Sequence, residues 1–175
     1  LESFSQNAPT VTASRLPDGR QSYYQTLETM AGLVRQAPLD YSLKQFANSL
    51  FNRYQIKGHD FADEIRLFFF LSDGITYRRD PVDVELVQDA KRTIQAGCGD
   101  CDDKVTLLCS LLAVAGFVSR FVAGGPSEDE LAHVWCEVLL DFSTGEWVAL
   151  DPTNEKASPG WYQQFPVMIT YDIFE

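Results

Sequence analysis

The spacing of apolar residues changes near Gly116, and this change constrains the fold more than any other feature of the chain. Before Gly116, apolar residues recur every three or four positions, which is typical of amphipathic helices. After it, they alternate with polar residues in short segments rich in Val, Phe and Trp, which is typical of strands. Helices followed by strands with hairpin-length loops predict an α+β fold with an antiparallel sheet, not alternating βαβ units.

Helices are expected at residues 21–37, 41–54, 60–73, 84–96 and 101–115. Asp60, Asp83 and Asp100 stand where N-cap residues are preferred, and glycine follows the last of these helices. The third helix contains Phe68, Phe69, Phe70 and Leu71, which is too apolar all round for a solvent-facing helix, so we expect it to be central.

Strands are expected at residues 117–124, 131–140 and 146–151, and residues 165–174 are a candidate for a fourth. With 175 residues, the chain predicts one domain. Its parts would be an extended polar arm at 1–20, N-terminal helices at 21–74 and a core at 75–175. The arm would lie outside the core, where it could contact a second copy of the chain or cover the active site.

The charge of the chain limits its partners. With 14 Lys and Arg against 25 Asp and Glu, its net charge is -11, which disfavours nucleic acid and anionic membranes. No apolar run approaches the roughly 20 residues that cross a bilayer. Cys109 and Cys136 stand in apolar runs and are interpreted as buried free thiols, which favours a reducing, cytoplasmic location. A signal peptide removed before Leu1 is also compatible with the sequence.

The segment Gly-Cys-Gly-Asp-Cys at residues 97–101 offers three chemistries: metal ligation, a redox pair, or a single nucleophile. A zinc site would combine Cys98 and Cys101 with Cys109, Cys136 or His133, but a second Cys-x-x-Cys is missing. A thioredoxin-like site would follow a strand, whereas helical sequence precedes this one. Calcium could bind Asp100, Asp102 and Asp103, although helix capping explains these carboxylates more simply.

Cys101 is predicted to lie in the first turn of a helix, with Asp100 as N-cap and Asp103 completing a capping box. Free backbone amides and the helix dipole at this position stabilise a thiolate, which is the reactive form of cysteine. The flanking aspartates oppose this effect, because nearby negative charge raises the pKa of a thiol. A cationic partner would therefore be needed.

His133 is the better of two candidates for that partner. His59 stands in a predicted surface loop, whereas His133 shares one face of a predicted strand with Trp135 and Glu137. In a hairpin turning at Ser143, the residue numbers of two paired positions add up to about 286. Because this sum is even, His133 and Asp151 lie on the same face of the hairpin. Cys101, His133 and Asp151 would form a nucleophilic triad if the Cys101 helix packs its start against that face.

Three stretches carry a resemblance to a known family: GCGDCDDKVTLLCSLLAVAGFVSRFVAGG, HVWCEVLL and WVALDPT. In order and spacing, they resemble the transglutaminase-like cysteine-enzyme superfamily, most closely its bacterial and phage-encoded members, over residues 75–153. The resemblance implies a papain-like fold with a catalytic core at 75–175. It also implies that Cys101 is the nucleophile, His133 the general base and acid, and Asp151 the orienting acid. Arg120 and Gly124 match as structural residues, and the resemblance is silent on residues 1–60.

The implied reaction is acyl transfer on a protein or peptide substrate, with hydrolysis of a peptide or amide bond favoured by the bacterial resemblance. Cross-linking through a lysine amine and a non-catalytic binding or assembly role, for example in a phage, are the alternatives. Tyr77 is a candidate second oxyanion donor, and Trp135 is interpreted equally as a cleft wall or as core packing. No metal or organic cofactor is expected.

Overall fold

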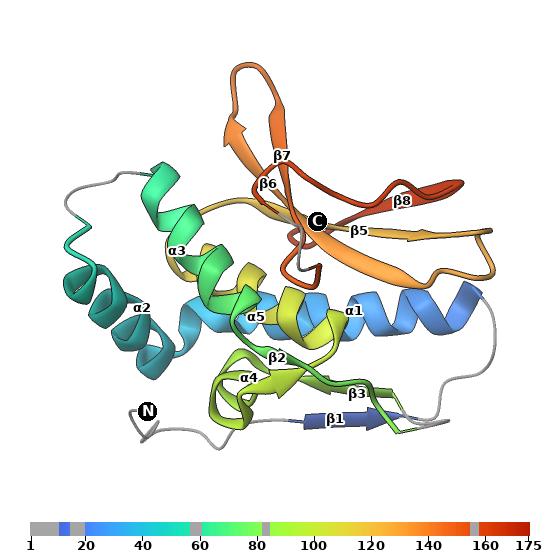
Figure 1. Ribbon diagram of the computed structural model, residues 1–175, viewed down its shortest axis with the longest axis horizontal. Helices are drawn as coiled ribbons and strands as arrows, with labels where there is room; N and C mark the ends of the chain where they lie inside the picture. Colours follow the sequence, from blue (N-terminus) through green and yellow to red (C-terminus); the bar gives the residue numbers. More distant parts are fainter. Residues whose placement is uncertain (1–10, 15–19, 57–60, 82–84, 155–157) are drawn as a thin grey trace.

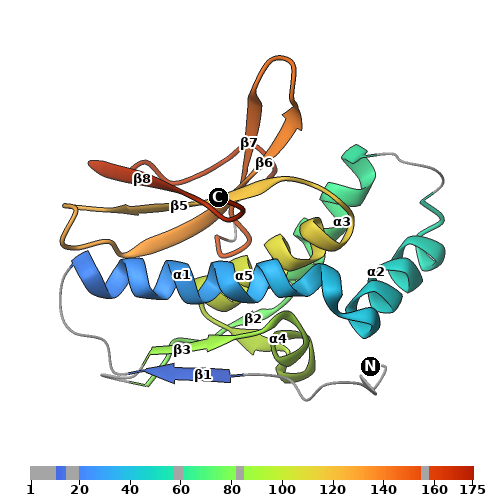
Figure 2. The same cartoon turned by 180° about the vertical axis from the view of Figure 1, so that it is seen from behind.

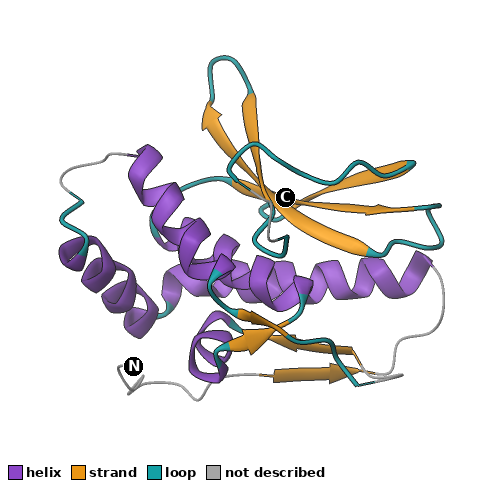
Figure 3. Cartoon of the chain, viewed as in Figure 1, coloured by secondary structure: helices purple, strands orange, loops and turns teal. Residues whose placement is uncertain are grey.

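The computed structural model describes residues 11–14, 20–56, 61–81, 85–154 and 158–175. Its elements form three layers, seen edge-on in Figure 1 and coloured by type in Figure 3. A four-stranded antiparallel sheet covers one side of a helical layer, and two short strand pairs with a small helix cover the other. The fold is therefore α+β, as the change of apolar spacing predicts.

Four of the five predicted helices lie close to their expected positions. They are α1 (Arg20–Gln36), α2 (Tyr41–Arg53), α3 (Phe61–Asp73) and α5 (Cys101–Val114). A short 3-10 helix, η1 (Ala37–Leu39), joins α1 to α2. No helix among the described residues is long and apolar enough to cross a membrane. The predicted cap Asp60 lies outside the described residues.

The central helix is α5, and α3 is only half central. Residues 103–113 of α5 are all buried, because α5 lies between α1 and α3 and also contacts the sheet (Figures 1 and 2). In α3, Phe68 and Phe69 are fully buried, whereas Phe70 is 61% exposed. The expectation that this helix is central therefore holds for one buried stripe of α3 only, because only one stripe of a helix can face the core when neighbours pack on one side.

The predicted helix at 84–96 is in fact a strand followed by a shorter helix. Strand β3 (Glu85–Gln88) pairs antiparallel with β1 (Val11–Ser14), so part of the predicted arm joins a sheet. Helix α4 (Ala90–Ala96) begins after Asp89, whose carboxylate accepts a hydrogen bond from the Arg92 N–H at 2.7 Å. The pairing with β1 and the cap at Asp89 together outweigh the helical spacing of the apolar residues. Asp83 and the remainder of the arm lie outside the described residues.

A short parallel pair leads into the cysteine helix. Strand β2 (Thr76–Tyr77) pairs with β4 (Cys98–Gly99), and the Arg78 N–H donates to the Gly99 carbonyl at 2.9 Å. A Cβ on Gly99 would lie 2.5 Å from the Asp103 Cβ, so only glycine permits this approach. The pair fixes the backbone immediately before Cys101.

The main sheet has the strand order β7-β6-β5-β8. Its strands are β5 (Ser119–Gly125), β6 (His133–Asp141), β7 (Glu146–Leu150) and β8 (Val167–Asp172), and all four were predicted. Cys136 pairs with Leu150 and Glu137 with Ala149, which is the register predicted for the hairpin. Val134, Cys136 and Val138 therefore face the main core, while Trp135 belongs to a separate cluster on the opposite face.

Arg120 and Gly124, which the family resemblance marks as structural, both contribute to the main sheet. The Arg120 guanidinium pairs with the Glu137 carboxylate at 2.7 Å and lies 4.0 Å from the Trp147 ring centre. Gly124 lies directly opposite His133 in the β5–β6 ladder. A Cβ at Gly124 would lie 2.4 Å from the Phe165 ring, so this glycine makes room for an aromatic side chain beside the histidine strand.

Candidate active site

Cys101 is the first residue of α5, as predicted. The Asp100 carboxylate accepts hydrogen bonds from the N–H groups of Asp102 and Asp103 at 3.1 and 3.4 Å. In return, the Asp100 N–H donates to the Asp103 carboxylate, which completes the predicted capping box. The Cys101 side chain therefore projects from the positive end of a well-capped helix.

His133 and Asp151 form the second part of the site. The His133 Nε2 lies 2.9 Å from the Asp151 Oδ2, and Thr153 donates to the Asp151 Oδ1 through its N–H (3.0 Å) and its hydroxyl (2.6 Å). Asp151 is 0% exposed. Burial raises its pKa, but the bonds from His133 and Thr153 outweigh burial, and the net pKa lies below the ordinary value. Asp151 is therefore ionised at neutral pH.

Cys101 and His133 line the same pocket, which has a volume of about 180 Å³. The Val134 N–H, next in the chain to His133, also donates a hydrogen bond to the Cys101 sulfur. The start of α5 thus lies beside the first residues of β6, whereas Cys109 of the same helix contacts Cys136 on the main-core face of that strand and not on the face that carries Trp135. Because Asp151 occupies Nε2, the other ring nitrogen, Nδ1, is the one suited to exchange a proton with the thiol.

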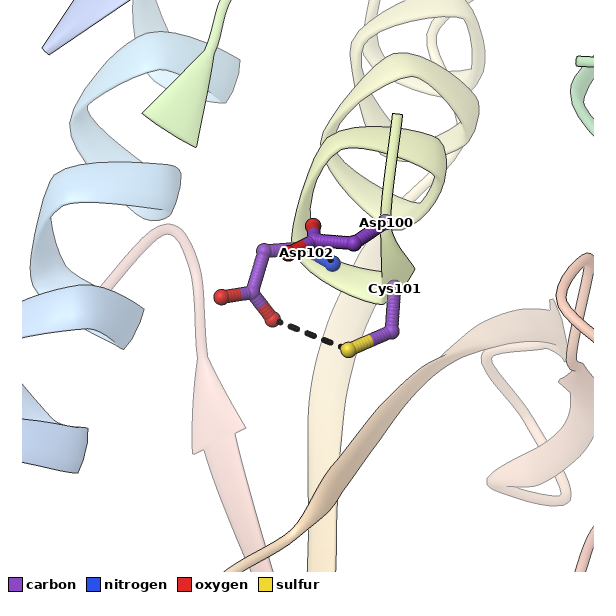
Figure 4. Close-up of side chains that lie close together, drawn as sticks. All are labelled: Asp100, Cys101 and Asp102. Carbon is purple, nitrogen blue, oxygen red and sulfur yellow. Dashed lines mark hydrogen bonds between the residues drawn. The ribbon is translucent and has the colours of Figure 1, made fainter. Parts of the chain in front are cut away.

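The Cys101 thiol has an acidic neighbour. Its Sγ lies 3.5 Å from the Asp102 Oδ1 and donates to it, as Figure 4 shows. Burial, followed by the negative charges of Asp102 and Asp100, raises the pKa of Cys101 well above its ordinary value. The pKa of Cys101 is therefore raised although the residue stands at the start of a helix, with burial as the main cause and the charges of the aspartates adding to it.

Three carboxyl groups share the pocket with the thiol: Glu85, Asp100 and Asp102. Burial, followed by a hydrogen bond with Glu85, raises the pKa of Asp102. Burial and the charge of Asp103 raise the pKa of Asp100 to about 7. Sequence reasoning missed Glu85, because the residue was assigned to a helix and not to the strand that carries it here.

Donor atoms of Asp100, Cys101 and Asp102 lie within 4.8 Å of one another (Figure 4), and their two carboxylates are ligands of the type that hard cations such as Ca²⁺ prefer. Asp103, the third carboxylate considered for calcium, instead accepts from the Gln88 N–H at 2.7 Å. Among the described residues, Cys98, Cys109 and Cys136 are not grouped with Cys101 as a zinc site would require.

An aromatic group packs behind the histidine. The His133 ring centre lies 5.9 Å from that of Trp135 and 6.0 Å from that of Phe165, and Trp135 stacks on Tyr162 at 5.5 Å. These contacts hold the imidazole plane. Tyr162 and Phe165 were missed, since their segment carries no motif and reaches the site only through tertiary packing.

The two further candidates lie beside the pocket and do not line it. Trp135 is 0% exposed, which corresponds to the core-packing interpretation. Tyr77 is 46% exposed, and burial, followed by the negative charges of Cys101 and Asp100, raises the pKa of its phenol. Tyr77 therefore lies near the start of α5. Cys109 and Cys136 are buried free thiols, and His59 lies outside the described residues.

Comparison with solved structures supports this fold. A candidate protease of Parabacteroides distasonis matches with a TM-score of 0.54 and 18% identity, over 77% of this chain and 26% of that one. A candidate cysteine protease of Cytophaga hutchinsonii matches with a TM-score of 0.48 and 18% identity, over 64% and 37%. At this identity the first likeness supports the fold alone, and this chain spans less than two thirds of either protein.

Comparison with curated proteins finds no match. The sequence profile of the transglutaminase-like superfamily matches residues 46–152, which is more than half of the chain. The matched region contains Cys101, His133 and Asp151, and it begins within α2, well before the motifs at the cysteine helix. The chain therefore belongs to the transglutaminase-like superfamily.

Proposed function

We propose that this protein is a cysteine-dependent acyl-transfer enzyme that hydrolyses a peptide or amide bond with Cys101, His133 and Asp151. The observation that carries the proposal is the 2.9 Å contact between His133 and the buried, ionised Asp151, at the pocket that also holds Cys101. This arrangement supplies a nucleophile, a base and a group that orients the base.

The reaction would begin with transfer of the thiol proton from Cys101 to His133. The sulfur attacks the carbonyl carbon of the substrate, and the electron pair moves to the carbonyl oxygen. When the tetrahedral intermediate collapses, the carbon–nitrogen bond breaks, and His133 gives its proton to the leaving amine. Water, deprotonated by His133, then attacks the thioester, which releases the acid and restores the thiol.

Asp151 has a positioning and electrostatic role in this scheme. Its carboxylate fixes Nε2 of His133 and stabilises the imidazolium that forms when the thiol loses its proton. The Cys101 N–H is suited to stabilise the oxyanion, because the first amides of a helix have no partner within that helix. Tyr77, near the start of α5, stays a candidate for a second donor.

The contact between Cys101 and Asp102 describes a resting state. Proton transfer to His133 requires the thiol to leave the Asp102 carboxyl, because a single S–H group cannot donate to both. Substrate entering the pocket would displace this contact. The enzyme would therefore react slowly with small alkylating agents at neutral pH, although the catalytic groups are present.

A lysine amine as acceptor is the second candidate, which would make the protein a cross-linking enzyme. Glu85 and Asp102 favour this acceptor, because carboxyl groups lining the pocket attract a cationic amine. Attack by the amine on the same thioester gives an amide in place of an acid. Incorporation of dansylcadaverine into casein, set against release of casein peptides, separates the two outcomes.

The test of the proposed function is the alkylation rate of each cysteine at several pH values, followed by peptide mass spectrometry. We expect the alkylation rate of Cys101 to depend on His133. The variant His133→Ala should therefore lower the rate at Cys101 and leave the rate at Cys98 unchanged. Casein hydrolysis should be lost in Cys101→Ala and in His133→Ala. The proposal is wrong if His133→Ala leaves both the Cys101 rate and hydrolysis unchanged.

A further inference from the structure

Three arginines line a second pocket, of about 420 Å³, next to the catalytic one. They are Arg78 and Arg79, which follow β2, and Arg92 of α4. The chain has only 14 basic residues against 25 acidic ones, so three arginines in one pocket form a local exception to its negative charge. We call this the arginine pocket.

The carboxylates within the arginine pocket are turned toward the backbone. Asp80 accepts a hydrogen bond from the Leu86 N–H, and Asp103, 1% exposed, accepts from both the N–H and the side-chain amide of Gln88. None of the three arginines forms an ion pair with another residue that the structure describes. The pocket therefore carries positive charge that the described carboxylates do not pair with.

The arginine pocket and the catalytic pocket lie on either side of the start of α5. Gly99 and Asp103 line the first, whereas Asp100 and Asp102 line the second. Arg79 also donates a hydrogen bond to the phenol of Tyr77, which lies near Cys101 and Asp100. An extended peptide advances about 3.3 Å per residue. A substrate whose scissile bond lies at Cys101 would therefore place a side chain near the arginines a few residues further along its chain.

We propose that the arginine pocket binds an acidic side chain of the protein substrate, a few residues from the bond that Cys101 attacks. The inference rests on the proposed function and names its substrate class: peptides with a Glu or Asp near the scissile bond. Guanidinium groups bind carboxylates with two parallel hydrogen bonds, and Arg78, Arg79 and Arg92 offer such donors from two elements. The net charge of -11 opposes a polyanion such as nucleic acid more strongly than one or two carboxylates of a peptide, which the local positive charge of the arginine pocket can attract.

The experiment measures binding with the reaction switched off by Cys101→Ser. Two fluorescein-labelled peptides, Gly-Glu-Glu-Glu-Glu-Gly and Gly-Gln-Gln-Gln-Gln-Gly, are titrated by fluorescence anisotropy. We expect the Glu peptide to bind about tenfold more tightly, because charge-assisted hydrogen bonds exceed neutral ones by roughly that factor. The double variant Arg78→Gln/Arg92→Gln should remove the preference.

The matched control is Arg53→Gln/Arg66→Gln, which removes the same charge from exposed positions on α2 and α3. It should keep the preference for the Glu peptide. Equal binding of the two peptides, or equal loss in both double variants, would overturn the proposal. The proposal would also be overturned if millimolar phosphate displaced both peptides and the Glu peptide bound no more tightly than the Gln peptide. That result would indicate a site for small anions. Alkylation of Cys101 is measured separately from peptide binding. An error in the proposed triad would therefore appear in the alkylation rates, and an error in the proposed role of the arginine pocket would appear in the peptide affinities.

Discussion

The Nε2 of His133 lies 2.9 Å from the Asp151 Oδ2, although the two residues are 18 positions apart in the chain. The β6–β7 ladder ends at Cys136 and Leu150, so this contact forms just past the last backbone pair, where the two strands separate. Thr153 holds the second carboxylate oxygen from the following turn. The hairpin register and one hydroxyl thus fix the orientation of the proposed base.

Replacing Asp151 by Asn should reduce casein hydrolysis by about 100-fold or more, because Asn cannot stabilise the imidazolium that forms at His133. The side chain keeps its size, so the fold should be retained. Thr153→Val is the matched comparison: it removes one donor to Asp151 while keeping the charge, and it should reduce the rate less. Initial rates on labelled casein provide the measurement, and wild-type rates in Asp151→Asn would contradict this assignment.

Replacing Asp102 by Asn should shift the alkylation profile of Cys101 to lower pH. After burial, the charge of Asp102 is the largest cause of the raised pKa of Cys101, and Asn lacks that charge. Rates of iodoacetamide modification at each cysteine, measured from about pH 6 to pH 10, give the midpoint. Asp129→Asn, in the loop before β6, changes the same charge away from the pocket and should leave the profile unchanged. An unmoved midpoint in Asp102→Asn would show that Asp102 does not hold the thiol.

Replacing Asp100 by Asn should make stability less dependent on pH. The pKa of Asp100 is about 7 in the folded protein, against about 3.9 when unfolded. Between these values the folded state binds the additional proton, so the free energy of unfolding falls as pH rises from about 4 to 7. Asn is an equally good N-cap and has no charge to bury. Urea midpoints at about pH 5 and pH 8 should differ less in the variant than in wild type, and an unchanged difference would refute the assignment.

Replacing Gly124 by Ala should destabilise the protein by about 1–3 kcal/mol, as is usual when a well-packed site is overfilled. The new methyl group would lie 2.4 Å from the Phe165 ring, which contacts both His133 and Trp135. Gly32→Ala is the comparison, because nothing lies within 4 Å of that Cβ and alanine favours the α1 helix. Urea unfolding should show Gly124→Ala less stable and Gly32→Ala equal or more stable. Equal midpoints for Gly124→Ala and wild type would show that Phe165 moves freely.

Local signals predicted the elements that carry the proposed triad. Asp100 and Asp103 cap the cysteine helix because capping depends on residues within one turn. The β6–β7 register follows from a short hairpin and from alternation along each strand, which are also local. These signals failed at Glu85, where pairing with β1 turned a helical pattern into a strand.

The α+β class, the helix start at Cys101 and the shared face of His133 and Asp151 could all be predicted from the sequence, since each depends on neighbours in the chain. Three other features required the folded structure: which helix is central, the packing of Phe165 against His133, and the pocket that Glu85 and Asp102 share with the thiol. These outcomes depend on contacts between distant segments. Local spacing does not encode such contacts, because they form only when burial and charge are balanced over the whole fold.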